Sequence, residues 1–139
     1  MAATLAALCD ALAEDNVTAD GLAQQIGEIA DGAGTQQITI RPRDDAWSRA
    51  EVISRAGEEE PALVRMTPAD PKALKVRDLD KAFGKPATLP PKVHFTDPES
   101  RIYEVDPGKP SHTAAIIAEL PPEGGKHVQA VVLRRDIRL

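Results

Sequence analysis

Apolar residues recur at steps of three and four positions in the first part of the chain. Leu5, Leu8 and Leu12 fall on one stripe of a helix, because side chains three and four positions apart share one helical face. This spacing predicts a helix from about Ala3 to Glu14.

A second stretch with helical spacing follows directly. Asn16 or Thr18 can cap it, because a short side-chain oxygen accepts hydrogen bonds from the free amides of a first turn. Its apolar positions are Leu22, Ile26 and Ile29. The "DGAG" segment at 31–34 supplies glycines for a helix terminus, so the helix is expected to end there.

The hydrophobic period then changes to two. Ile38 and Ile40 alternate with Thr39 and Arg41, which predicts a strand with one buried face. The segment "AWSRAEVISR" at 46–55 is typical of a second strand, with a helical turn as the alternative. After a break at "GEEEP", residues 62–66 predict a third strand. Ala62, Val64 and Met66 lie on one face of it, and Leu63 and Arg65 on the other.

Helical spacing returns in "LKVRDLDKAFGKP", residues 74–86. Leu79, Ala82 and Phe83 mark about two turns, and Gly84 followed by Pro86 ends them. We expect this helix to lie across a sheet as a structural brace. Four further strands are predicted beyond it, at "KVHF" (92–95), "RIYEV" (101–105), "HTAAIIAEL" (112–120) and "HVQAVVLRR" (127–135).

This order of elements favours an α+β fold, with short N-terminal helices packed on antiparallel β-sheet. The length of 139 residues fits a single domain, 1–139. The two halves also align in their apolar positions, with Leu22 over Leu79 and Ile26 over Phe83. Residues 17–68 and 74–139 are therefore candidate tandem units, each a helix followed by a β-meander.

Composition narrows the class of protein. Hydrophobic residues make up 42% of the chain and charged residues 28%, and no run approaches the ~20 apolar residues of a membrane-spanning helix. A lone cysteine, Cys9, favours a reducing cytoplasm. The net charge of -5 comes from residues 1–40, which contain acids and no Lys or Arg. That block is a solvated face or a surface for a basic partner.

Catalytic residue types are scattered. His94, His112 and His127 fall on three different predicted strands, without the spacing of a metal motif, so no metal or other cofactor is expected. Ser111 and His112 are adjacent on a strand and so face opposite sides, which excludes them as a nucleophile and its base. Cys9 is expected to pack in the core.

Nucleic-acid binding is disfavoured. Arginines recur along the predicted strands, but the chain has only two Phe, one Tyr and one Trp, and its net charge is negative. We expect the two phenylalanines, Phe83 and Phe95, to lie in the core, which leaves few aromatic rings to stack on bases.

Two of the predicted strands are apolar on both faces. In residues 113–120, Ala115 and Ile117 lie on one face, and the alternate positions on the other face are also apolar. The last predicted strand shows the same arrangement, with Ala130 and Val132 on one face and apolar residues on the other. A sheet with one face in water shows polar residues there. The second face is therefore expected to be covered by the N-terminal helix, by the other half of the chain, or by another molecule.

These observations favour a non-catalytic protein-binding or adaptor module that uses a sheet face. Its partner would be another protein or a second copy of the chain. The expected contacts are Trp47, Arg49, Arg65 and Tyr103, since arginine and large aromatics dominate such surfaces. The alternative is a small-ligand-binding protein or enzyme with a pocket between helix and sheet, using His112, His127 or Tyr103. No segment carries the signature of a known family.

Overall fold

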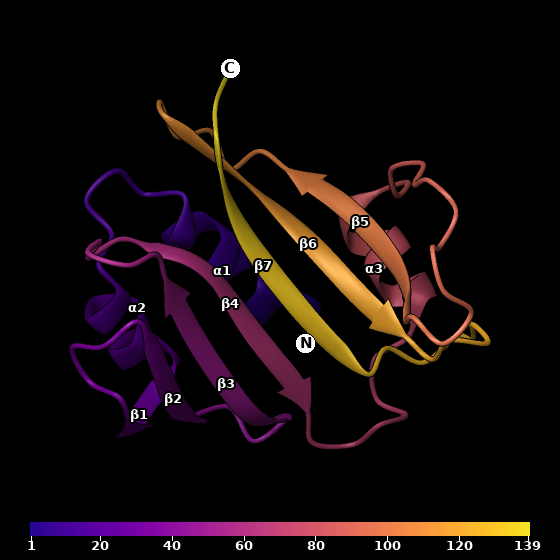
Figure 1. Cartoon of the computed structure of the whole chain (residues 1–139), viewed down its shortest axis with the longest axis horizontal. Helices are drawn as coiled ribbons and strands as arrows, with labels where there is room; N and C mark the ends of the chain where they lie inside the picture. The colour runs from indigo at the N-terminus through magenta and orange to yellow at the C-terminus, as the bar shows by residue number, and fades with distance from the viewer.

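A computed structural model describes all residues of the chain, 1–139. It contains three helices and seven strands (Figure 1). In chain order they are α1 (Ala2–Leu12), α2 (Ala19–Ile26), β1 (Gly27–Asp31), β2 (Gln37–Pro42), β3 (Trp47–Ser54), β4 (Pro61–Pro68), α3 (Val76–Phe83), β5 (Glu99–Val105), β6 (His112–Leu120) and β7 (Ala130–Ile137). The α+β prediction, with N-terminal helices packed on antiparallel sheet, is confirmed.

All seven strands form one open antiparallel sheet in the order β1-β2-β3-β4-β7-β6-β5. The first four strands follow chain order from one edge. The last three run inward from the other edge, so that β7 pairs with β4 at the centre. The seven strands are thus continuous across the boundary between the two candidate units, and the tandem arrangement stays a prediction.

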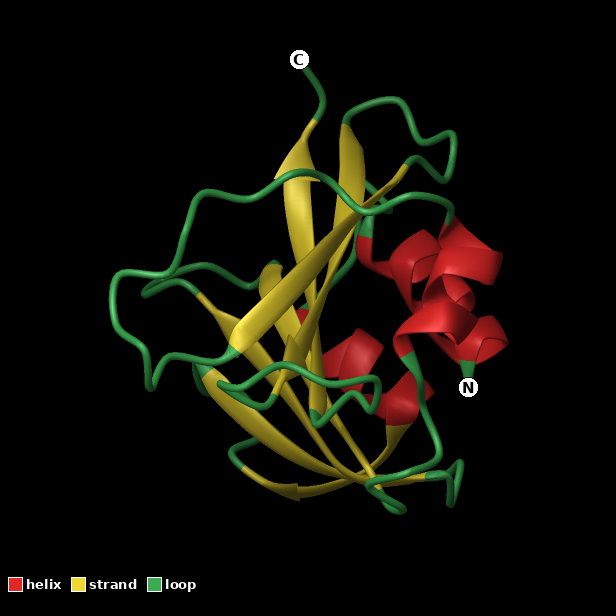
Figure 2. Ribbon diagram, turned by 90° about the vertical axis from the view of Figure 1, so that its right-hand side faces the viewer, coloured by secondary structure: helices red, strands yellow, loops and turns green.

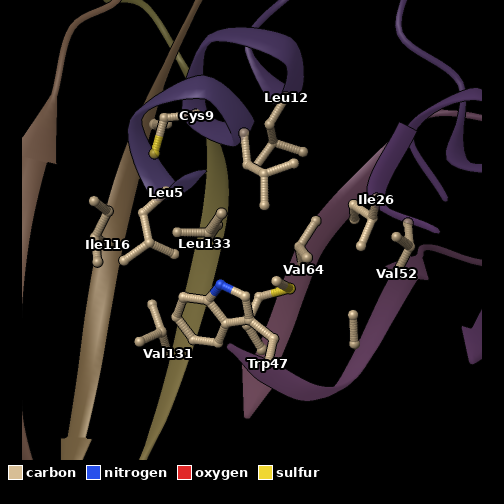
Figure 3. Close-up of a cluster of buried hydrophobic side chains, with 14 of the residues drawn as sticks. Leu5, Cys9, Leu12, Ile26, Trp47, Val52, Val64, Ile116, Val131 and Leu133 are labelled. Atoms are coloured by element: carbon tan, nitrogen blue, oxygen red, sulfur yellow. The ribbon is translucent and has the colours of Figure 1, made fainter. Parts of the chain in front are cut away.

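The three helices lie on the same side of this sheet, as Figure 2 shows. α2 packs on β1, β2 and β3, α1 on β6 and β7, and α3 beside β5. Between helices and sheet, 25 buried residues form one cluster that includes Leu5, Leu12, Val64 and Leu133 (Figure 3). The burial of this aliphatic layer is the main source of stability.

The second helix ends earlier than its apolar spacing predicts. Thr18 caps α2, its Oγ1 accepting a hydrogen bond from the Gly21 amide at 3.1 Å. The helix stops at Ile26, and the chain continues directly into β1. At Gly27 a Cβ would lie 2.1 Å from the backbone oxygen of Arg41, so this junction requires glycine. Ile29 is therefore a strand residue, and "DGAG" contributes to the β1–β2 turn.

The strand predicted at 92–95 is wrong, and so is the core position expected for Phe95. Residues 92–95 form bends and a turn, β5 begins at Glu99, and Phe95 is 82% exposed. Pro90, Pro91 and Pro98 flank the segment, and proline cannot donate a hydrogen bond to a ladder. The strand predicted at 127–135 begins at Ala130, whereas the strands predicted at 46–55 and 112–120 correspond to β3 and β6.

Candidate functional site

Strand register assigns each side chain to one face of the sheet, because residues directly opposite each other on paired strands point to the same side. Val64, Leu133 and Ile116 are partners across β4, β7 and β6, and all three are buried under the helices. Their sequence neighbours point the other way. No helix covers that second side, which we call the open face (Figure 2).

A row of aliphatic side chains crosses the open face. Its members lie on five adjacent strands, from β3 to β5, and each is partly exposed. They are Ile53, Leu63, Val132, Ile117 and Ile102. Val132, Ile117 and Ile102 are direct cross-strand partners, and Ile53 is opposite Leu63. Between β4 and β7 the two groups are diagonal neighbours, because Arg134 is opposite Leu63 and Arg65 is opposite Val132. We call this set the aliphatic row.

Ion pairs border the row. Arg65 Nη1 and Nη2 donate to the two carboxylate oxygens of Glu119 at 2.6 and 3.3 Å. Arg49 Nε lies 3.4 Å from a Glu51 oxygen. On β7, Arg134 Nε lies 2.7 Å from Asp136 Oδ1. The positive charges at the centre of the open face therefore have carboxylate partners within the chain.

The segment after α3 forms one side of a groove that opens onto the row. Ala87 donates its amide hydrogen to the Ile102 carbonyl at 2.8 Å, which joins this segment to the outer edge of β5. The groove has a volume of about 740 Å³, and its lining includes Leu89, Pro90, Ile102 and Ile117. Two members of the aliphatic row are thus also part of the groove.

The turn at 92–97 holds two large apolar side chains in solvent. Val93 is 85% exposed and Phe95 is 82% exposed. The Lys92 ammonium fixes the turn, donating to the backbone oxygens of Phe95 and Asp97, each at 3.3 Å, and to the Pro122 carbonyl. It also forms an ion pair with Glu99 at 3.2 Å. The partly buried Lys92 thus organises the backbone that presents Val93 and Phe95.

The four residues expected to contact a protein partner separate between the two faces. Arg49 and Arg65 lie on the open face. Trp47 and Tyr103 are 2% and 1% exposed and belong to the core on the helix side, so neither offers surface to a partner. The Tyr103 hydroxyl instead donates to Asp80 of α3 at 2.7 Å.

The three histidines do not meet. His112 begins β6, with Nδ1 3.6 Å from Asp15 Oδ1, whereas His127 lies beyond the opposite end of β6 and bridges to Lys75. His94 is exposed in the turn at 92–97. His112 lines a groove of about 840 Å³ that neither His127 nor Tyr103 reaches, so the small-ligand alternative stays a prediction. No group of three or more His, Cys, Asp or Glu side chains is arranged to hold a metal ion.

Groups with shifted pKa values are also separated. Burial raises the pKa of Cys9 to about 12. Burial and then the hydrogen bond to Asp80 raise the pKa of Tyr103 above its usual range. The hydrogen bond from Arg138 lowers the pKa of Asp106 to about 2. Each shift moves the pKa further from 7, so none of these residues is suited to proton transfer near pH 7.

Sequence reasoning found part of the open face and missed the rest. The apolar second faces of β6 and β7 were visible as Ala115, Ile117, Ala130 and Val132. Ala115 and Ala130 are buried within the chain, whereas Ile117 and Val132 are partly exposed. Ile53, Leu63 and Ile102 were not identified from the sequence, because a single aliphatic residue on a strand can be assigned to a shared surface only when the strand register is known.

Comparisons with protein-family models, with curated proteins and with solved structures find no match for this chain. None of the three helices has the length and apolar character needed to cross a membrane.

Proposed function

We propose that this chain is a non-catalytic protein-binding module whose binding surface is the open face of its sheet. The observation that carries the proposal is the aliphatic row, which lies on the side of the sheet that has no helix. Neighbouring strands are about 4.8 Å apart, so a row over five strands extends about 19 Å. A set of partly exposed aliphatic side chains on one face of a sheet, beside the exposed Val93 and Phe95, is typical of an interaction site.

The charges on this face indicate the chemistry of the partner. Arg49 and Arg65 are paired with Glu51 and Glu119 inside the chain, and the Arg65 pair is bidentate. Arginines that are already neutralised provide little of the positive field that nucleic-acid backbones require. The open face therefore suits an apolar, mostly uncharged segment of another protein, with the ion pairs at its rim.

Phe95 and Val93 are the anchor residues in this proposal. Large side chains that are exposed before binding and buried after it supply much of the energy of protein interfaces, and aromatic rings lose little conformational entropy. The Lys92 contacts hold the turn before any partner arrives, which lowers the entropy cost of association. The groove between this segment and Ile117 links the anchors to the aliphatic row.

Site-specific photo-crosslinking in the cells that make the protein tests the proposal. A benzophenone side chain is placed at Leu63 or Phe95 on the binding side, and at Gln24 or Lys81 on exposed helix positions as controls. The binding-side positions should give a discrete crosslinked product with another protein. The helix positions should give none, because they face away from the proposed surface.

Two substitutions supply the matched control. Val132→Glu places a charge in the middle of the aliphatic row and should abolish the product, whereas Ala6→Glu adds the same charge to the exposed side of α1 and should leave it intact. Circular dichroism verifies that both variants are folded. Products that survive Val132→Glu, that arise equally from Gln24 and Lys81, or that are absent at Leu63 and Phe95 would overturn the proposal. A crosslinked product of twice the chain mass would show that the partner is a second copy of this chain and not a different protein.

A further inference from the structure

A second groove lies on the helix side of the sheet, between α1 and α2. α2 packs mainly on β1 to β3 and α1 on β6 and β7, so the space between the two helices lies over β4. The resulting groove has a volume of about 400 Å³, within the range of sites that hold small molecules. Ala7 and Leu8 of α1 line one wall and Ile26 of α2 the other.

Trp47 and Met66 complete the apolar lining. Trp47 is the only tryptophan of the chain, and its Nε1 is buried without a hydrogen-bond acceptor. Figure 3 shows the indole nitrogen turned toward the side chains beneath α1. A buried indole N–H usually has a partner, so the chain alone leaves the polar groups under this groove incompletely satisfied.

The rim carries one cation without an ion-pair partner. Arg43 Nη1 and Nη2 donate to the backbone oxygens of Gln25 and Gln24 at 3.2 and 3.3 Å, so both acceptors are neutral. The neighbouring Asp44 accepts from the Thr4 hydroxyl at 3.1 Å and from the Ala46 amide at 3.0 Å, and it forms no ion pair with Arg43. The guanidinium therefore retains donors and a positive charge beside an apolar groove.

We infer that the groove between α1 and α2 binds a small, mainly apolar molecule that carries one anionic group, such as an aromatic carboxylate or sulfonate. Its ring system enters between Ala7 and Pro42, above the buried floor formed by Trp47 and Leu8, and its anionic group meets Arg43 at the rim. This site is on the opposite side of the sheet from the aliphatic row and is independent of the proposed protein-binding surface.

The test uses 8-anilinonaphthalene-1-sulfonate and the uncharged N-phenyl-1-naphthylamine as probes. Energy transfer from Trp47, the single tryptophan, to the bound probe gives the affinity. Ala7→Phe fills the groove, and Ala6→Phe adds the same ring to an exposed position of α1 outside it. Saturable binding of one sulfonate per chain should weaken about tenfold or more in Ala7→Phe and remain within about twofold in Ala6→Phe.

Arg43→Gln and Arg77→Gln separate the role of the rim cation from a general change of net charge, since Arg77 is exposed on α3 and away from the groove. Arg43→Gln should weaken the sulfonate about tenfold and leave the neutral probe unchanged, while Arg77→Gln should alter neither. Circular dichroism verifies folding of each variant.

Three results would overturn the inference. Equal effects of Ala7→Phe and Ala6→Phe would place the probe elsewhere. Loss of binding in Val132→Glu with no effect of Ala7→Phe would assign the probe to the open face. A sulfonate affinity that does not respond to Arg43→Gln would remove the anionic group from the description of the ligand.

Discussion

Arg134 and Arg135 are consecutive on β7 and point to opposite sides of the sheet, so they allow a sharp test of the structure. The Arg135 side chain is 6% exposed. Its Nε donates to the Leu12 carbonyl at 2.9 Å, its Nη2 to the Glu14 carbonyl at 3.0 Å, and its Nη1 to the Glu60 carboxylate at 3.0 Å. It thereby holds the end of α1 against the sheet and supplies donors to carbonyls that a helix terminus leaves free.

Arg135→Met keeps the apolar stem and removes all three hydrogen bonds. A hydrogen bond contributes about 1 kcal/mol net, and more when it involves a charged donor to a buried acceptor, so the expected loss is about 2–3 kcal/mol. Unfolding entropy is about 2.1 cal/mol/K per residue, which makes this loss about 7–10 °C in Tm for a chain of 139 residues. Urea unfolding monitored by circular dichroism measures the free energy directly.

Arg134→Met is the matched control, because it removes the same charge one residue away. Its side chain is 45% exposed and pairs with Asp136, so the expected loss is about 0.5 kcal/mol or less. Glu60→Gln should also cost only about 0.5 kcal/mol, since the Glu60 side chain is 56% exposed. Equal losses for Arg134→Met and Arg135→Met, or a loss below about 1 kcal/mol for Arg135→Met, would refute the assignment of faces.

Four further outcomes are expected. Gly27→Ala should lower the free energy of unfolding by more than about 2 kcal/mol, because its Cβ would lie 2.1 Å from a backbone oxygen. Gly57→Ala, at φ +77° with open space around it, should lower it by about 1 kcal/mol. Equal urea midpoints for the two variants would contradict this difference. Tyr103→Phe should cost about 1 kcal/mol through loss of the hydrogen bond to Asp80, and a wild-type midpoint would argue against that bond. Because the pKa of the single tyrosine is raised in the folded state, stability should fall as pH rises past the unfolded value of about 10, and tyrosinate absorbance should appear only on unfolding; earlier absorbance would contradict it. Burial raises the pKa of Cys9 to about 12, so a disulfide reagent should react only as fast as the protein opens, and rapid labelling at neutral pH would be inconsistent with the core position.

The sequence by itself determined the class of fold and most of its elements. Periods of three to four in Leu5, Leu8 and Leu12, and of two in Ile38 and Ile40, are local consequences of helix and strand geometry. These periods can therefore be recognised without knowing which elements pack together. The predicted end of the second helix was wrong because the close backbone approach at Gly27 starts a strand directly after Ile26. The strand predicted at 92–95 was wrong because the flanking prolines prevent strand pairing there.

Which face each side chain occupies was decided only by the tertiary structure. Trp47 and Tyr103 look like surface contacts in the sequence and lie in the core, and Phe95 shows the reverse. Arg134 and Arg135 are the same residue type at adjacent positions, yet Arg134 lies on the open face and Arg135 binds the end of α1. The physical reason is that strand order and register join residues far apart in the chain. The β4–β7 pairing alone brings Leu63 opposite Arg134, and no local pattern encodes that contact.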